Sequence, residues 1–305
     1  SPTGPFKDAI GRPLYEGSWD FIDPTVFVDD DGQAYLYWGN PNVYYAKLNA
    51  DMVSLDGEVS KVEQTIESFG SPGPDKREKG KKYKDIYTEG PWLHKRGGTY
   101  YLSYAAGGVP EHIAYSMSDT PTGPWKYMGE IMPLQDTGSF TNHCGVTDYK
   151  GNSYFFYHTG KLPGGGGFGR SVAVEQFSYN PDGTFPIINA TTEGVSPVGT
   201  LTPYQRVEAE TIAFSEGVKS EWNAKTGVYV SGIHDGDYIK VREVDFEDLS
   251  PKCLCVSVAS ALRGGWIEIR TDSIGGTLIA EMRVPHTGGW ECWTSIEADV
   301  TVPVT

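Results

Sequence analysis

The sequence predicts an all-β protein that consists of part of a β-propeller followed by a β-sandwich. The first observation is the composition: 8 Trp, 19 Tyr and 12 Phe occur together with 38 Gly and 20 Pro. This mixture is typical of short strands joined by tight turns, and it suits a surface that stacks on sugars. The second observation is a repeated hairpin, and the third is a change of pattern near residue 203. Together they exclude a helix bundle and a Rossmann fold.

Three hairpins of similar design predict the propeller. In each, two strands rich in aromatic or β-branched residues flank a charged turn with a glycine, and the copies are residues 25–38, 92–104 and 146–157. The turn glycines Gly32, Gly98 and Gly151 lie 66 and 53 residues apart. A further strand candidate follows each hairpin, at residues 43–48, 112–117 and 171–177. Three strands plus a fourth per repeat is the period of a propeller blade.

A second repeat concerns the start of the chain. The segment at residues 2–6 returns almost unchanged at residues 121–125, 119 residues later. The later copy closes a blade, so we expect the earlier copy to close a blade whose beginning is missing. Only three blades are then complete, whereas a propeller needs at least about four to close. The alternative is a β-sandwich built from three unclosed hairpins.

The aromatic hairpins stop near residues 196–203, and a different pattern follows. From Val207 onward the sequence contains short alternating strands, such as residues 238–242. This pattern predicts a separate β-sandwich of about 100 residues. We therefore expect a partial propeller over residues 1–203 and a partial sandwich over residues 206–305.

The charge balance limits the classes of partner. Forty acidic and 25 basic residues give a net charge of −15 and a pI near 4.8. Nucleic acids and anionic membrane surfaces require clustered Lys and Arg, so neither is expected as the main partner. The sequence contains no apolar run of about 18 residues that would predict a transmembrane helix. Its first five residues show no signal peptide.

Glu89 is the first candidate for chemistry. It lies between Tyr87 and Trp92 and is followed by a Gly-Pro dipeptide at the start of a predicted strand. We expect this carboxylate to be partly desolvated, which raises its pKa. A glutamic acid that stays protonated at neutral pH can protonate a glycosidic oxygen as a general acid. The alternative is a glutamate that only caps a turn.

Asp23, His143 and Arg170 occupy similar positions in their own repeats. Asp23 precedes Pro24, which favours an extended backbone before it. Because the inner strands of a propeller begin near its axis, Asp23 and Glu89 are expected to converge there, together with His143. Arg170 precedes another strand and could hold a carboxylate or sugar hydroxyls with its planar fork. The alternatives are an ordinary Asp-Pro turn and a structural His and Arg.

Several of these segments resemble a known family. Residues 21–40, 87–92 and 168–174 are similar, in order, to motifs of glycoside hydrolase family 43, particularly its arabinofuranosidases and xylosidases. The resemblance covers roughly residues 1 to 203. The tail resembles a family 6 carbohydrate-binding module at residues 207–210, 236–238 and 287–290.

The resemblance to family 43 implies a five-bladed propeller that hydrolyses glycosidic bonds with inversion. It implies Glu89 as the general acid and Asp23 as the residue that tunes the pKa of this acid and orients it. It implies His143 as an axial histidine beside a calcium ion or a water cluster. Arg170 would reach the sugar-binding subsite, and Trp92 is expected to contact the substrate. No residue matches the family's general base, an aspartate of the first blade, so the chain alone is expected to be nearly inert.

The resemblance to the binding module implies a second sugar site. Trp290 matches an aromatic residue that could stack on a pyranose ring, whereas Gly232 stands where a partner aromatic is expected. Glu208 and Glu210 match acidic residues near a structural calcium ion, and the alternative is that they are exposed strand carboxylates.

These observations lead to one main hypothesis. We expect a secreted hydrolase that releases terminal arabinofuranose or xylose from hemicellulose, with structural calcium and no organic cofactor. The partner would be a hemicellulose polysaccharide or oligosaccharide. Two alternatives remain: a non-catalytic carbohydrate-binding protein, and one chain of a propeller whose missing blades come from a second chain.

Overall fold

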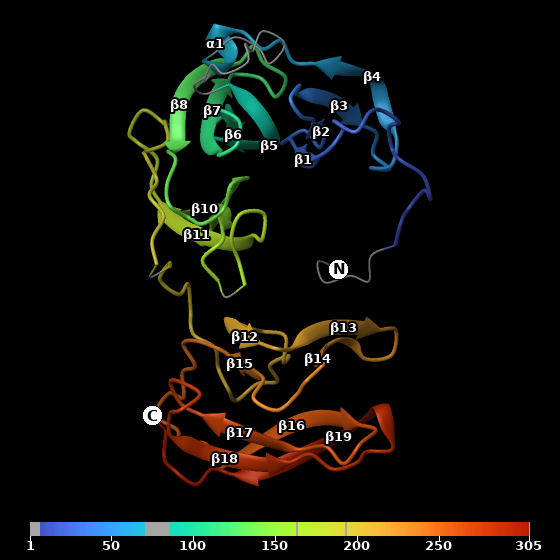
Figure 1. Cartoon of the computed structure of the whole chain (residues 1–305), viewed down its shortest axis with the longest axis vertical. Helices are drawn as coiled ribbons and strands as arrows, with labels where there is room; N and C mark the ends of the chain where they lie inside the picture. The colour runs from blue at the N-terminus through green and yellow to red at the C-terminus, as the bar shows by residue number, and fades with distance from the viewer. Residues whose placement is uncertain (1–6, 71–85, 163, 193, 305) are drawn as a thin grey trace. The chain divides into compact units, whose positions relative to one another are not determined.

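The computed structural model describes residues 7–70, 86–162, 164–192 and 194–304 (Figure 1). The chain divides into two compact units, one over residues 8–196 and one that includes residues 197–305. Among the described residues the structure is almost entirely β, with one four-residue helix, α1 (Ile66–Phe69). The predicted all-β class is therefore confirmed. None of the described helical residues forms a segment long and apolar enough to cross a membrane.

The first unit contains three antiparallel sheets whose strands follow one another in the chain. The first sheet has the order β1 (Thr25–Val28), β2 (Ala34–Trp38), β3 (Tyr44–Leu48), β4 (Leu55–Lys61). The second has the order β5 (Tyr87–Arg96), β6 (Thr99–Ala106), β7 (His112–Ser118), β8 (Lys126–Met132). The third has the order β11 (Ser171–Phe177), β10 (Asn152–Thr159), β9 (Gly145–Tyr149). A five-bladed, closed propeller stays a prediction.

The three repeated hairpins form as antiparallel pairs, β1–β2, β5–β6 and β9–β10. Each predicted turn glycine has a left-handed backbone, with φ of 86° at Gly32, 85° at Gly98 and 82° at Gly151. Only glycine adopts this region without a steric penalty from Cβ. The repeat therefore reflects a turn geometry that the sequence specifies three times.

Two apolar clusters join the sheets of the first unit. One contains residues of β2, β5 and β6 together with α1, and its fully buried members include Tyr37, Phe69 and Tyr87. The other contains residues of β6, β7, β8, β9, β10 and β11. The hydroxyl of Tyr87 donates to the Gly39 carbonyl at 2.5 Å, which satisfies the polar end of a buried ring. These contacts fix the ends of β2 and β5 beside each other.

The second unit is built from antiparallel strand pairs and is sandwich-like. The pairs are β12 (Phe214–Glu216) with β15 (Tyr238–Lys240), β13 (Lys219–Asn223) with β14 (Gly227–Ser231), β16 (Cys253–Ser260) with β19 (Gly289–Asp299), and β17 (Trp266–Arg270) with β18 (Leu278–Arg283). Ile279, Ala280 and Met282 of β18 are buried, so this pair contributes to the core of the unit.

Candidate active site

Glu89 lies at an irregular point near the start of β5. The register between β5 and β6 shifts on both sides of it, between Tyr87 and Glu89 and between Glu89 and Trp92. Such irregularities bend a strand and re-aim its side chains, often beside active sites. The Glu89 side chain is only 14 % exposed, so its carboxylate is largely withdrawn from water.

Gly90 makes room for an imidazole beside Glu89. Its φ is 59°, and a Cβ placed there would lie 2.8 Å from Cγ of His143. That distance is below normal van der Waals contact, so any larger residue would displace the ring. The glycine therefore allows His143 to lie directly against the backbone of β5.

Asp23 reaches the same place from the segment before β1. This segment is held to the end of β2, because Gly39 N–H donates to the Ile22 carbonyl and Asn40 N–H to the Asp20 carbonyl, both at 2.9 Å. The φ of Asp23 is 57°, so the extended backbone expected before Pro24 is wrong. Asp tolerates this left-handed region better than most residues, and here it aims the carboxylate at His143.

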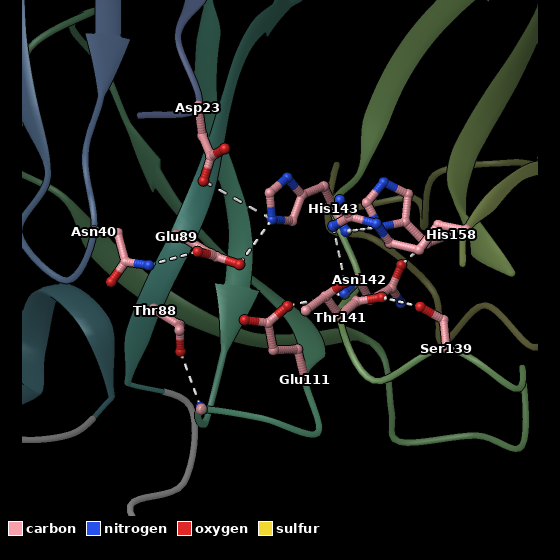
Figure 2. A network of polar contacts seen from close by, with 12 residues as sticks. Asp23, Asn40, Thr88, Glu89, Glu111, Ser139, Thr141, Asn142, His143 and His158 are labelled. Atoms are coloured by element: carbon pink, nitrogen blue, oxygen red, sulfur yellow. Dashed lines mark hydrogen bonds and ion pairs between the residues drawn. The ribbon is translucent and has the colours of Figure 1, made fainter. Parts of the chain in front are cut away.

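His143 is the centre of the constellation (Figure 2). Its Nε2 lies 3.1 Å from Oε1 of Glu89 and 3.9 Å from Oδ2 of Asp23. Asn40 Nδ2 donates to the other oxygen of Glu89, Oε2, at 2.5 Å. Both oxygens of Glu89 are therefore held, and the structure brings together Asp23, Glu89 and His143 from three separate segments.

The local charges set the protonation of Glu89 and His143. The hydrogen bond from His143 lowers the pKa of Glu89, and this effect outweighs the burial that would raise it. Burial works against the charged imidazole, but the hydrogen bond to Glu89 and the charge of Asp23 raise the pKa of His143. The raised pKa expected for Glu89 is therefore wrong in this arrangement, because the imidazole stabilises its ionised form.

Asp23 has the opposite shift. Its burial raises the pKa, and the charge of Glu89 adds to this, although His143 and the Gly90 amide oppose it. Oδ2 of Asp23 is buried and has no hydrogen-bond partner among the described residues. Two carboxyl groups next to one imidazole thus differ in their affinity for a proton, which is the pattern expected of an acid–base site.

Sequence reasoning missed Glu111, which lies directly before β7. It is 5 % exposed, and its Oε2 accepts from the Asn142 N–H at 2.9 Å. Burial raises its pKa to about 7, and the charge of Glu89 contributes. Glu111 belongs to no motif, and the available signal was its position directly before a strand.

His158 was missed as well. The backbone N–H of His143 donates to its Nδ1 at 3.3 Å, and the two imidazole rings stack with centroids 5.1 Å apart. Burial lowers the pKa of His158 to about 4, and the charges of His143 and Arg170 contribute. His158 is therefore a neutral acceptor that positions His143 from behind.

Arg170 and Trp92, the two predicted substrate contacts of the first unit, lie in different surroundings. Arg170 is exposed, and its Nη1 donates to Thr141 Oγ1 at 2.9 Å, two residues before His143. The indole N–H of Trp92 donates to the Val146 carbonyl at 3.3 Å, and the ring packs on the second apolar cluster. These contacts of Trp92 join β5 to β9.

The remaining candidates lie in the second unit. Trp290 is on β19 and is 63 % exposed. Nε of Arg206 lies 2.9 Å from Oε1 of Glu208, so this carboxylate is paired with a cation. Within the described ranges, Glu208 and Glu210 do not belong to a group of three metal-ligating side chains.

Asp23, Glu89 and His143 form a candidate acidic metal site, because their ligand atoms lie within 4.8 Å of one another. Calcium takes roughly six to eight oxygen ligands at flexible geometry. Here one of three donors is an imidazole nitrogen, and that nitrogen is already bonded to Glu89. This donor set by itself does not fit calcium.

Comparisons with known proteins agree with this architecture. Residues 1–185 match Glycosyl hydrolases family 43, and residues 208–304 match Carbohydrate binding module (family 6). An arabinoxylan arabinofuranohydrolase of Bacillus subtilis (strain 168) is 34 % identical over 347 residues, which cover 99 % of this chain and 63 % of the relative. One from Paenibacillus polymyxa is 32 % identical, covering 98 % of this chain and 50 % of the relative.

Solved structures give the same result. The crystal structure of a family 43 arabinoxylan arabinofuranohydrolase from Bacillus subtilis, in complex with cellotetraose, is similar with a TM-score of 0.79 and 32 % identity. The similarity covers 99 % of this chain and 67 % of that chain. The chain thus spans about half to two thirds of the length of these relatives.

Two carboxyl groups lie beside an imidazole on an all-β scaffold, and the same chain matches a carbohydrate-binding module. These features define a carbohydrate-active class of protein. The chain belongs to glycoside hydrolase family 43.

Proposed function

We propose that the protein hydrolyses glycosidic bonds of hemicellulose and releases terminal arabinofuranose or xylose from arabinoxylan or xylan-type chains. The observation that carries this proposal is the contact of Glu89 with His143 at 3.1 Å, with Asp23 beside them. The similarity to two arabinoxylan arabinofuranohydrolases supports the substrate class. We assign the chemistry to residues 1–203 and additional sugar binding to residues 206–305.

Glu89 acts as the general acid in this proposal. In the arrangement described here the proton of the Glu89–His143 pair lies on the imidazole side, because the pKa of Glu89 is lowered and that of His143 is raised. A sugar that enters the site excludes water and so favours the neutral forms of both groups. The proton then moves from Nε2 of His143 to Oε1 of Glu89 and onward to the glycosidic oxygen as the bond breaks.

Asp23 raises the proton affinity of Glu89 and orients it. Its carboxylate oxygen lies within 4.8 Å of the Glu89 oxygen, and both approach the same imidazole nitrogen. They therefore lie side by side and not across a sugar ring. An inverting enzyme needs its base about 6.5–9.5 Å from the acid, on the opposite face of the sugar. We assign no residue of this chain to that base.

Two further side chains bind sugar in this proposal. The guanidinium of Arg170, whose Nη1 bonds Thr141, presents its remaining N–H groups to sugar hydroxyls. Trp290 offers an exposed indole face to a pyranose ring in the binding module. A polymeric substrate of this kind implies action outside the cell.

Release of free pentose from arabinoxylan tests the proposal, with Glu89→Gln as the variant and Glu58→Gln, an exposed carboxylate of β4, as the control. Glu89→Gln should abolish any release, and Glu58→Gln should leave it unchanged. Because no residue of this chain is assigned as the base, release by the unmodified protein would mean that the base comes from a residue not assigned here. Turnover that survives Glu89→Gln would show that Glu89 is not the acid. Retention on xylan without product, from a folded sample, would favour a binding protein. Particle size on gel filtration then shows whether a second chain supplies the base.

A further inference from the structure

The second unit contains a cationic hollow that none of the preceding roles uses. The hollow has a volume of ≈ 400 Å³ and is lined by Arg263, Arg283, Pro285 and His286. All four residues are exposed. Among the described residues no carboxylate lies within ion-pair distance of Arg263, Arg283 or His286, whereas Arg206 and Arg270 are both paired.

This positive charge stands against the overall balance of the protein. The protein as a whole has a net charge of −15, whereas two guanidinium groups line this one hollow. Unpaired guanidinium groups attract anions, and their planar forks match a carboxylate with two parallel hydrogen bonds. The hollow is therefore suited to an acidic group of a ligand.

An exposed indole lies next to this charge. The register of β17 and β18 places Trp266 directly opposite Arg283. Opposite residues of an antiparallel pair point to the same face, with Cβ atoms about 4.5–5.5 Å apart. Trp266 is 64 % exposed and has no ring contact with another described aromatic residue. Its face is thus available to stack on the apolar face of a pyranose.

The next pair of opposed residues on this face of the β17–β18 sheet is acidic. Glu268 lies opposite Glu281, and both are exposed. Nε of Arg270 lies 2.8 Å from Oε2 of Glu268, so one of these carboxylates is partly neutralised. An acidic group is attracted at the end of the sheet where Trp266 and Arg283 lie and is repelled one pair further along. The charge pattern therefore fixes the end at which an anionic ligand binds.

We propose that this end of the β17–β18 face binds a polysaccharide through a hexuronic acid residue. The pyranose ring stacks on Trp266, and the carboxylate accepts hydrogen bonds from Arg283 and Arg263. The match of residues 208–304 to a carbohydrate-binding module favours a sugar over another anion. The proposed site uses none of Trp290, Glu89 and Asp23. Its failure and the failure of the proposed hydrolysis are therefore distinguishable.

Calorimetric titration of the full chain tests this proposal with two probes. One is a xylo-oligosaccharide that carries a single glucuronic acid, and the other is the same oligosaccharide after reduction of its carboxyl group. We expect the acidic probe to bind about tenfold more tightly at low salt, as one charge-assisted contact implies. Arg283→Gln should reduce this difference, because only Arg263 then contacts the carboxylate, and Trp266→Ala should weaken the binding of both probes. Molar salt should reduce the difference, because it screens exposed charges.

Matched controls come from the same unit. Arg242→Gln changes an exposed arginine and Trp222→Ala an exposed tryptophan, both outside the hollow, and neither should change the affinity. Equal binding of the two probes, or an unchanged difference in a folded Arg283→Gln variant, would overturn the proposal. Equal competition by sodium sulfate would show a simple anion site and would also overturn it. If Arg283→Gln disturbs the sheet, Arg263→Gln repeats the test from the loop before β17.

Discussion

The imidazole of His143 lies against Gly90, and this contact places its Nε2 3.1 Å from Oε1 of the neighbouring Glu89. The carboxylate and the residue that makes room for its partner are thus consecutive in the chain. His158 accepts from the His143 backbone on the other side, so the ring is positioned by two segments. The geometry of the acid therefore depends on a glycine with no functional group.

Replacement of Gly90 by alanine should separate His143 from Glu89. The new Cβ would lie 2.8 Å from Cγ of the ring, and φ of 59° is strained for alanine. We expect the pKa of His143, measured by proton NMR, to fall toward its ordinary value, and pentose release to drop at least about tenfold, as expected for a displaced catalytic group.

Gly97→Ala is the matched control for this variant. Its φ is 56°, nearly that of Gly90, but nothing lies within 4 Å of the added Cβ. Both variants should lose about 1 kcal/mol of unfolding free energy from backbone strain. Only Gly90→Ala should change the pKa of His143. Equal pKa values in the two variants would show that the close approach at Gly90 is not required.

The Glu89–His143 pair should stabilise the folded protein most strongly within a limited range of pH. The pKa of Glu89 is lowered from 4.5, so its contribution is present above that value and is lost as the pH falls through the folded-state pKa. The pKa of His143 is raised from 6.5, so its contribution is present below that value and is lost as the pH rises through the folded-state pKa. Both contributions are complete between about pH 4.5 and 6.5.

The melting temperature of Glu89→Gln relative to the unmodified protein measures this window. We expect the largest loss between about pH 5 and 6.5 and a smaller loss at higher pH, as His143 loses its proton and Glu89 is left beside the charge of Asp23. Glu58→Gln should show a flat difference over the same range. A constant loss for Glu89→Gln from pH 4 to 9 would contradict the ion pair.

Glu111 should destabilise the protein at high pH. Its folded-state pKa of about 7 is raised from 4.5 by burial, so its neutral form is favoured in the fold. Stability is therefore complete below the unfolded-state pKa and is lost as the pH rises through about 7, by roughly 3 kcal/mol. Glu111→Gln should remove this loss and melt higher than the unmodified protein at pH 8. Identical pH profiles of the two proteins would show that Glu111 does not titrate as described.

The sequence predicted those parts of the fold that depend on local pattern. The hairpins follow from strand composition and from glycines such as Gly32, whose left-handed φ the turn requires. It also paired Asp23 with Glu89 across 66 residues, because both precede a strand at the same place in a repeat. Local rules sufficed here because each repeat encodes its own turn and its own strand start.

The sequence could not supply contacts that depend on packing between sheets. Asn40, which holds Glu89, comes from the end of β2, and Glu111 comes from the loop between β6 and β7. The direction of the Glu89 pKa shift depends on the distance to His143, which no local pattern encodes. Trp92 shows the same limit, because no local pattern encodes its hydrogen bond to the Val146 carbonyl of the neighbouring sheet. Its contact with substrate stays a prediction.

Addition and removal of calcium test whether this ion binds beside His143, as the sequence resemblance implied. Asp23, Glu89 and His143 offer three donors, and the imidazole nitrogen among them is a poor ligand for calcium. We expect the melting temperature to change by less than about 1 °C when millimolar calcium is added or a chelator is applied, since an ion that does not bind the folded state adds no stability. Magnesium at the same concentration controls for ionic strength.

A saturable rise in melting temperature with calcium would contradict this expectation. Asp23→Asn and Glu208→Gln would then locate the ion, because the first changes the site in residues 8–196 and the second a carboxylate of the second unit. A rise lost only in Asp23→Asn would mean that further oxygen ligands complete the site around His143. A rise lost only in Glu208→Gln would mean that calcium competes successfully with Arg206, whose Nε lies 2.9 Å from the Glu208 carboxylate. Each result would assign the ion to one of the two units.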